Sequence, residues 1–137
     1  MKANIGAYPD EGEQVVEVEI HDYDTWSMDY TLAPIILPML VQLRDTKQGV
    51  PLVDSADVPW GEGAEPLNQS AEDIAEMVKR WDYVLSAMIF SFDKLVNNPD
   101  WPLCLDGKFV TKTFHTRGEQ MQLGFTLFGK YYQSLWD

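Results

Sequence analysis

Two pairings of a basic with an aromatic residue could contribute to a binding site in a sequence that is otherwise acidic. Arg80 precedes Trp81, and Lys130 precedes Tyr131 and Tyr132. If the fold brings the two places together, they would form a small pocket that stacks a base on an aromatic ring and neutralises a phosphate. The alternative, which we favour, is that Arg80 and Lys130 form ion pairs with nearby acidic residues on the surface.

Tryptophan is frequent for a chain of this length, and two of the five tryptophans stand in different contexts. Trp81 lies on the apolar stripe of an expected helix, so packing in the core is its default interpretation. Trp60 lies between Pro59 and Gly61 in an acidic segment. There it either folds back onto the protein body or serves as an exposed anchor for a partner. The sequence favours neither of these two interpretations.

Other combinations of reactive side chains are weaker as sites. His21, Asp22 and Asp24 stand together, but a metal site needs more ligands in a defined geometry, and we interpret them as a strand end followed by a helix cap. Cys104 with His115 could be a nucleophile and its base, although a plain hairpin cysteine is the favoured interpretation. The sequence also lacks the serine-hydrolase, zinc-protease, P-loop and dinucleotide-binding motifs. We therefore predict no enzymatic activity, no metal and no cofactor.

Composition limits the class of partner. The 137 residues include 22 acidic and 10 basic ones, which gives a formal net charge of −12, and 45% of the chain is hydrophobic. This length fits a single domain over residues 1–137. The charge repels phosphate backbones, so we expect no direct nucleic-acid binding. A basic protein surface or a small ligand in a local pocket is the more natural partner. The longest apolar stretch, residues 32–41, is too short for a membrane span, and a single cysteine fits a reducing cytosol.

The first third of the chain predicts one strand and one helix. Residues 1–13 are polar and rich in glycine and acids, so we expect a loose lead-in. Apolar and polar residues alternate over 16–20, which indicates a strand with one buried face. Apolar residues then recur at helical spacing over about 26–44. Pro34 and Pro38 interrupt this helix, so we expect it to be kinked or broken in two.

The remainder predicts a loop, two helices and a hairpin. Residues 49–69 indicate a long acidic loop. Loops of this length in a compact domain tend to be functional or disordered. Ser70 caps a helix that ends near residue 97. Asp106-Gly107 between β-prone runs predicts a hairpin, which could join the first strand in a three-stranded sheet. The last helix runs from about 117 to 135. Its expected inner face consists of Met121, Phe125, Phe128, Tyr132 and Leu135. The fold class is therefore α+β, with three main helices packed on a small antiparallel β-sheet.

Several blocks of this sequence resemble a family of uncharacterised proteins encoded by large tailed bacteriophages. The blocks are YDTWSMD at 23–29, LPML at 37–40, GVP at 49–51, VD at 53–54, DVP at 57–59, KRWDYVL at 79–85, MIF at 88–90, GFTLFGKYY at 124–132 and LWD at 135–137. This chain departs from the family in lacking a longer acidic insert before the last helix. It also has Tyr30 and Gln48 where relatives often have histidine. The resemblance implies a phage origin and expression in the cytoplasm of an infected bacterium, and it implies no reaction.

The shared blocks lie at element ends and in a loop, where binding sites tend to be found. They give the candidate ligand-binding residues Trp26, Asp29, Asp54, Trp60, Arg80, Trp81, Lys130 and Tyr131. Our leading hypothesis is a non-enzymatic phage accessory protein that acts by binding and sequesters a nucleotide-type host-defence signal. The alternatives are an acidic interaction protein that inhibits a basic host protein, and a minor virion or assembly component. A homo-oligomer is compatible with each of these.

Overall fold

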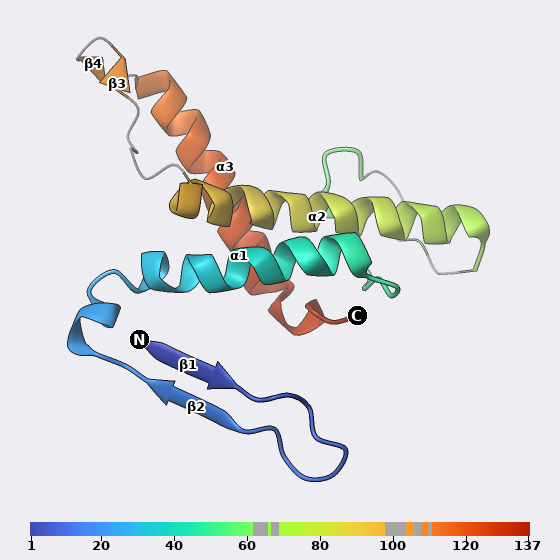
Figure 1. Cartoon of the computed structure of the whole chain (residues 1–137). Coiled ribbons are helices and arrows are strands. Elements are labelled where there is room, and N and C mark those ends of the chain that lie inside the picture. The colour runs from blue at the N-terminus through green and yellow to red at the C-terminus, as the bar shows by residue number, and fades with distance from the viewer. Residues whose placement is uncertain (62–65, 67–68, 98–103, 106–107, 110) are drawn as a thin grey trace. The chain divides into compact units, whose positions relative to one another are not determined.

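The chain forms two compact units in a computed structural model (Figure 1), namely Met1–Leu32 and Ala33–Asp137. The structure describes residues 1–61, 66, 69–97, 104–105, 108–109 and 111–137, and it describes the side chains of these residues except in 104–117. The expectation of one domain over residues 1–137 stays a prediction.

The first unit contains a two-stranded antiparallel sheet, in which β1 (Lys2–Ile5) pairs with β2 (Val16–Glu19). Ile5 lies opposite Val16, and Lys2 lies opposite Glu19. Because side chains alternate along a strand, the apolar residues share one face and the charged ones the other. The expected strand is confirmed, but three expectations about this region are wrong. Residues 2–5 form the strand β1, although they were expected to be part of a loose lead-in. The partner of β2 is this strand and not the expected hairpin. The apolar face of β2 is exposed, although it was expected to be buried.

A short 3-10 helix, η1 (Asp22–Thr25), follows the sheet. The carboxylate of Asp24 accepts a hydrogen bond from the backbone N–H of His21 at 2.8 Å and lies 2.8 Å from the amino group of Met1. These two contacts lower the pKa of Asp24, and the hydrogen bond from the terminal amino group is the larger cause. The carboxylate therefore closes the start of η1 on His21, whereas the sequence had placed Asp24 as a cap of the long helix that follows.

The first long helix, α1 (Met28–Thr46), is a single element that contains both Pro34 and Pro38. Each proline removes one internal backbone hydrogen bond, which would favour a break in an isolated helix. The helix nevertheless continues across both positions. Ala33 and Leu40 are buried in the core of the second unit, and this packing compensates for the lost hydrogen bonds. Of the two predicted outcomes, the break into two helices does not occur.

The second unit is organised around α2 (Ala71–Asn97). Ser70 caps it as expected, since its hydroxyl accepts a hydrogen bond from the N–H of Asp73 at 3.1 Å. One apolar stripe of α2 supplies half of the buried hydrophobic residues in the described part of the chain, namely Met77, Trp81, Val84, Leu85, Met88 and Phe92. The capping residue and the spacing of this stripe are local signals, which is why this helix was predictable.

The last helix, α3 (Thr111–Lys130), crosses α2 (Figure 1) and is followed by the 3-10 turn η3 (Tyr132–Ser134). The two helices approach closely at Gly124, where an added Cβ would lie 1.9 Å from the Ser91 hydroxyl. Leu127 and Tyr131 are the buried residues at this end of the chain. Tyr132 was expected on the inner face, but it is exposed because the helix ends before it.

The expected hairpin is present as β3 (Cys104–Leu105) and β4 (Lys108–Phe109). It forms its own two-stranded sheet and does not join β2, so the predicted three-stranded sheet is wrong. The α+β class with three helices and small antiparallel sheets is confirmed.

The first part of the expected acidic loop packs onto the second unit. Val53 and Val58 are buried in the core, on either side of the short 3-10 helix η2 (Ser55–Asp57). We call residues 50–61 the clamp loop. Residues 62–65 and 67–68 lie outside the described part of the chain.

Candidate functional site

Six of the eight predicted ligand-binding residues come together in the second unit. They are Asp54, Trp60, Arg80, Trp81, Lys130 and Tyr131, which we call the aromatic–basic cluster. The clamp loop and the middle of α2 each supply two of them, Lys130 is the last residue of α3, and Tyr131 follows it. Trp26 and Asp29 belong to the first unit, and no shared site is described for them.

Arg80 fastens the clamp loop to α2. Its side chain is 3% exposed, and its Nε donates to Glu76 Oε1 at 2.9 Å. One terminal nitrogen donates to the carbonyl of Val53 and to the hydroxyl of Ser55, both at 3.0 Å. The hydrogen bond from Arg80, followed by that from Trp60, lowers the pKa of Glu76. A guanidinium that is this buried and this fully bonded is not available to a phosphate.

Lys130 and Tyr131 fasten the clamp loop to α3. Lys130 Nζ lies 2.5 Å from Asp57 Oδ2 and 3.2 Å from Asp54 Oδ2. The Tyr131 hydroxyl donates to Asp57 at 2.5 Å and accepts from the N–H of Asp54 at 3.0 Å. The hydrogen bond to Asp57 raises the pKa of Lys130, and burial raises the pKa of Tyr131. The ion pairs that the sequence favoured as the alternative therefore form.

The two tryptophans of the cluster serve packing. Trp60 folds back, because its indole N–H donates to Glu76 Oε1 at 2.7 Å and its ring meets Tyr83 edge-on at 5.4 Å. The ammonium of Lys79 lies 4.3 Å from the centre of the same ring. Trp81 is fully buried and meets Tyr131 edge-on at 5.8 Å. The cluster is therefore a clamp that fixes the 50–61 segment to α2 and to the end of α3.

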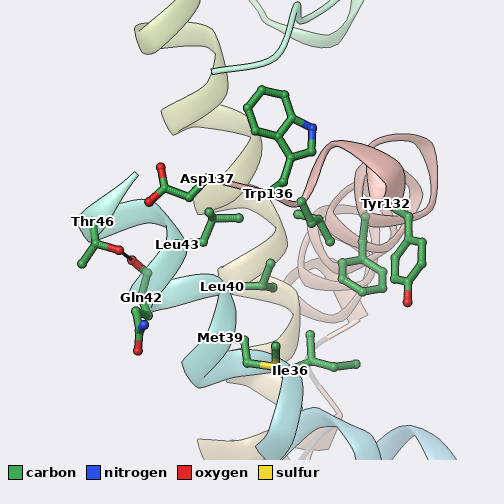
Figure 2. Close-up of a pocket in the computed structure, with 11 residues that line it drawn as sticks. Ile36, Met39, Leu40, Gln42, Leu43, Thr46, Tyr132, Trp136 and Asp137 are labelled. Carbon is green, nitrogen blue, oxygen red and sulfur yellow. Dashed lines mark hydrogen bonds between the residues drawn. The ribbon is translucent and has the colours of Figure 1, made fainter. Parts of the chain in front are cut away.

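A second feature of this unit was not predicted. An apolar groove of about 670 Å³ lies between one side of α1 and the segment that follows α3. Figure 2 shows α1 side chains on one side of it and Tyr132 and Trp136 on the other. Its lining residues are Ile36, Met39, Leu40, Gln42, Leu43 and Thr46 from α1, with Phe128, Tyr132, Leu135, Trp136 and Asp137 opposite. Met39 is 68% exposed and Tyr132 is 63% exposed, so the groove is open to solvent.

The wall opposite α1 is held by contacts with the end of α1 and the residues that follow it. The Asp137 carboxylate accepts hydrogen bonds from the backbone N–H of Gln48 at 2.5 Å and of Gly49 at 3.4 Å. The Trp136 ring lies against Gly49 so closely that an added Cβ would be 2.9 Å from it. This wall therefore has a defined position before any partner binds.

The groove was missed because its residues look like core residues in the sequence. The spacing of Ile36, Met39 and Leu43 is typical of a buried stripe. However, Ala33 and Leu40 are the residues of α1 that are buried. A helix with apolar residues on more than one side exceeds what a single buried face needs, and this excess was the available signal.

Metal binding can be judged in the described residues. They contain no group of three or more His, Cys, Asp or Glu side chains that could hold a metal ion. The side chains of Cys104 and His115 lie outside the described part of the chain. Among the described helices, none combines the length and the apolarity that crossing a membrane requires.

Comparisons with known proteins do not assign the site. The resemblance to a phage family, and the function it suggested, therefore stay predictions. The chain matches no protein-family model, no curated protein and no solved structure.

Proposed function

We propose that this protein is a non-enzymatic binding protein whose partner is a basic protein, and that the apolar groove is the contact surface. The observation that carries the proposal is the groove itself, an open apolar trough with a positioned aromatic wall on a strongly acidic chain. Exposed apolar patches of appreciable size mark interaction sites in soluble proteins. Methionine and aromatic residues are also enriched in the buried centres of interfaces, and Met39, Tyr132 and Trp136 supply both types here.

Charge supports a basic partner. The formal net charge of −12 attracts a basic surface at long range and speeds its association. Among the residues that line the groove, Asp137 is the charged one, and it is acidic. A basic partner therefore meets no repulsion from the groove lining while its apolar side chains are buried.

The contacts of the aromatic–basic cluster support sequestration of a nucleotide less well. That hypothesis needs Arg80 or Lys130 to neutralise a phosphate. Arg80 is buried with three protein acceptors, and Lys130 contacts two carboxylates. Binding a phosphate there would first require breaking the contacts that hold the clamp loop, at a cost of several hydrogen bonds to charged groups.

In the proposed setting, the protein is a phage accessory protein in the cytoplasm of an infected bacterium and inhibits a basic host protein. The family resemblance supports the setting, and the acidic charge supports the nature of the target. The groove supports inhibition by direct contact, because an apolar trough buries part of whatever partner it holds.

The test is affinity capture from bacterial lysate with matched variants of the full chain. The groove variant carries Met39→Gln and Tyr132→Gln, and the control carries Leu52→Gln and Ile74→Gln at apolar residues of comparable exposure outside the groove. We expect the parent and the control to retain the same basic protein at low salt and to lose it at high salt. The groove variant should retain at least about tenfold less, since each anchor is worth on the order of 1 kcal/mol or more. Equal capture by the groove variant, or no partner at either salt concentration, would refute the proposal.

A further inference from the structure

We infer that the segment held by the groove is an amphipathic helix with a basic outer face; this rests on the proposed function. The groove is built along a helix. Ile36, Met39 and Leu43, with Leu40 between them, form a stripe that spans about 11 Å of α1, given the rise per residue of an α-helix. Helix-in-groove recognition uses anchors at this same spacing on the incoming helix, so the side chains of two helices can interdigitate over about two turns.

The walls of the groove argue against an extended strand. Strand addition requires an open sheet edge with unpaired backbone N–H and C=O groups. Here one wall is α1 and the other is the end of α3 with the turn that follows it. Apart from the carbonyl groups that Pro34 and Pro38 leave without a helical N–H, the backbone groups of α1 bond along the helix. Such a wall does not offer the regular row of open N–H and C=O groups that an extended peptide needs for its own backbone. A helix satisfies its backbone internally and presents only side chains.

The openness of the groove argues against a small apolar molecule. Small-molecule sites bury most of the ligand surface. Here Met39 and Tyr132 are more than half exposed, so a small apolar ligand would remain largely in water. An amphipathic helix would bury its apolar face in the groove and keep its polar face in solvent.

The charge of the chain fixes the nature of that second face. The groove belongs to the second unit, whose residues 33–137 include 14 acidic and 9 basic ones, so lysine or arginine on the outer face of a bound helix is attracted by the net negative charge of that unit. Met39 can adapt to the anchors of different helices because its side chain is unbranched and flexible. Trp136 and Tyr132 provide the rigid opposite wall.

The test uses a designed peptide of leucine and lysine, with leucine at i, i+3, i+4 and i+7, titrated calorimetrically into the full chain. The first control is a peptide of the same composition in scrambled order, which has the same charge and no apolar face. We expect the amphipathic peptide to bind at least tenfold more tightly than the scrambled one. The Met39→Gln/Tyr132→Gln variant should lose at least tenfold for the amphipathic peptide, and the Leu52→Gln/Ile74→Gln variant should lose less than twofold.

Equal binding of the scrambled peptide would overturn the inference, because attraction would then depend on charge alone. So would tighter binding of a proline-rich peptide or of a fatty acid at the groove, or self-association of the chain that the groove variant abolishes. Failure here is distinguishable from failure of the proposed function. If lysate capture depends on the groove but cross-links map to a non-helical segment of the partner, the function stands and the helix inference falls.

Discussion

The crossing of α2 and α3 makes a quantitative prediction about Gly124. An added Cβ at this position would lie 1.9 Å from the Ser91 hydroxyl oxygen and 2.3 Å from the carbonyl oxygen of Ala87. The second contact is with backbone, so rotation of one side chain cannot relieve it. The helices must separate, and a gap of even 0.5–1 Å forfeits roughly a quarter to a half of the dispersion energy of the contacts it opens.

The expected cost of Gly124→Ala follows from two opposing effects. Overpacking of a close helix crossing costs about 1–3 kcal/mol or more, whereas alanine regains up to about 1 kcal/mol of helix propensity over glycine. We therefore expect a net destabilisation of roughly 1–2 kcal/mol. Gly129 lies on the same helix, and a Cβ added there would have no heavy atom within 4 Å. Gly129→Ala should be neutral or stabilising by up to about 1 kcal/mol, since only the propensity changes.

The assay is urea unfolding of both variants, followed by far-ultraviolet circular dichroism. In a thermal scan of a chain of this size, the same loss corresponds to a decrease in melting temperature of roughly 4–8 °C. Adding Ser91→Gly to Gly124→Ala should recover only part of the loss, because the contact with the Ala87 carbonyl remains. If Gly124→Ala is as stable as the parent, or if Gly129→Ala loses as much, the close approach of the two helices is wrong.

Three further predictions concern the clamp and the groove wall. Asp57→Asn should destabilise the chain by about 1–3 kcal/mol in urea unfolding, because a neutral amide weakens the two hydrogen bonds that α3 makes to this carboxylate; an unchanged midpoint would contradict the clamp. Arg80 stabilises the ionised form of Glu76, whose pKa is lowered from 4.5, so this stability is present above about pH 4.5 and is lost as the pH falls through the folded-state pKa. Glu76→Gln should therefore flatten the dependence of stability on pH between about 5 and 3, and an unaltered slope would count against the pairing. Gly49→Ala should displace the Trp136 ring, since the added Cβ would lie 2.9 Å from it; a shift in tryptophan fluorescence with weakened partner capture is expected, and unchanged capture would show that this wall is dispensable.

Local signals made part of this fold predictable. Ser70 and the long apolar stripe specified α2, and Asp106-Gly107 specified the hairpin. The strand at Lys2–Ile5 was missed because four residues carry little pattern and the partner lies more than ten residues away. The inner face of the last helix was misassigned near its end for a geometric reason. The chain changes from 3.6 to about 3 residues per turn after Lys130, which turns Tyr132 outward although its helical spacing places it inside.

The candidate site was also only partly predictable from the sequence. The sequence identified the residues of the aromatic–basic cluster but left open whether the fold would bring them together. The spacing of four residues between Glu76 and Arg80 is a local signal of an ion pair on a helix. The sequence could not show that Asp57 would take up the hydrogen bond of Lys130, because these two residues lie seventy-three positions apart. The groove was hidden for a related reason. Burial of Leu40 and exposure of Met39 depend on what packs against α1, and both are apolar in the sequence.

The indole resonances in a ¹H–¹⁵N correlation spectrum of the full chain test the central claim most directly, because tryptophans mark both candidate surfaces. Trp136 lines the groove and Trp60 belongs to the aromatic–basic cluster. The spectrum would be recorded during titration with the leucine–lysine helix and, separately, with ADP-ribose. We predict that the peptide shifts the Trp136 resonance and leaves Trp60 in place, and that ADP-ribose shifts neither. A shift of Trp60 on addition of ADP-ribose, with Trp136 unmoved by the peptide, would contradict the assignment of the groove as the binding surface.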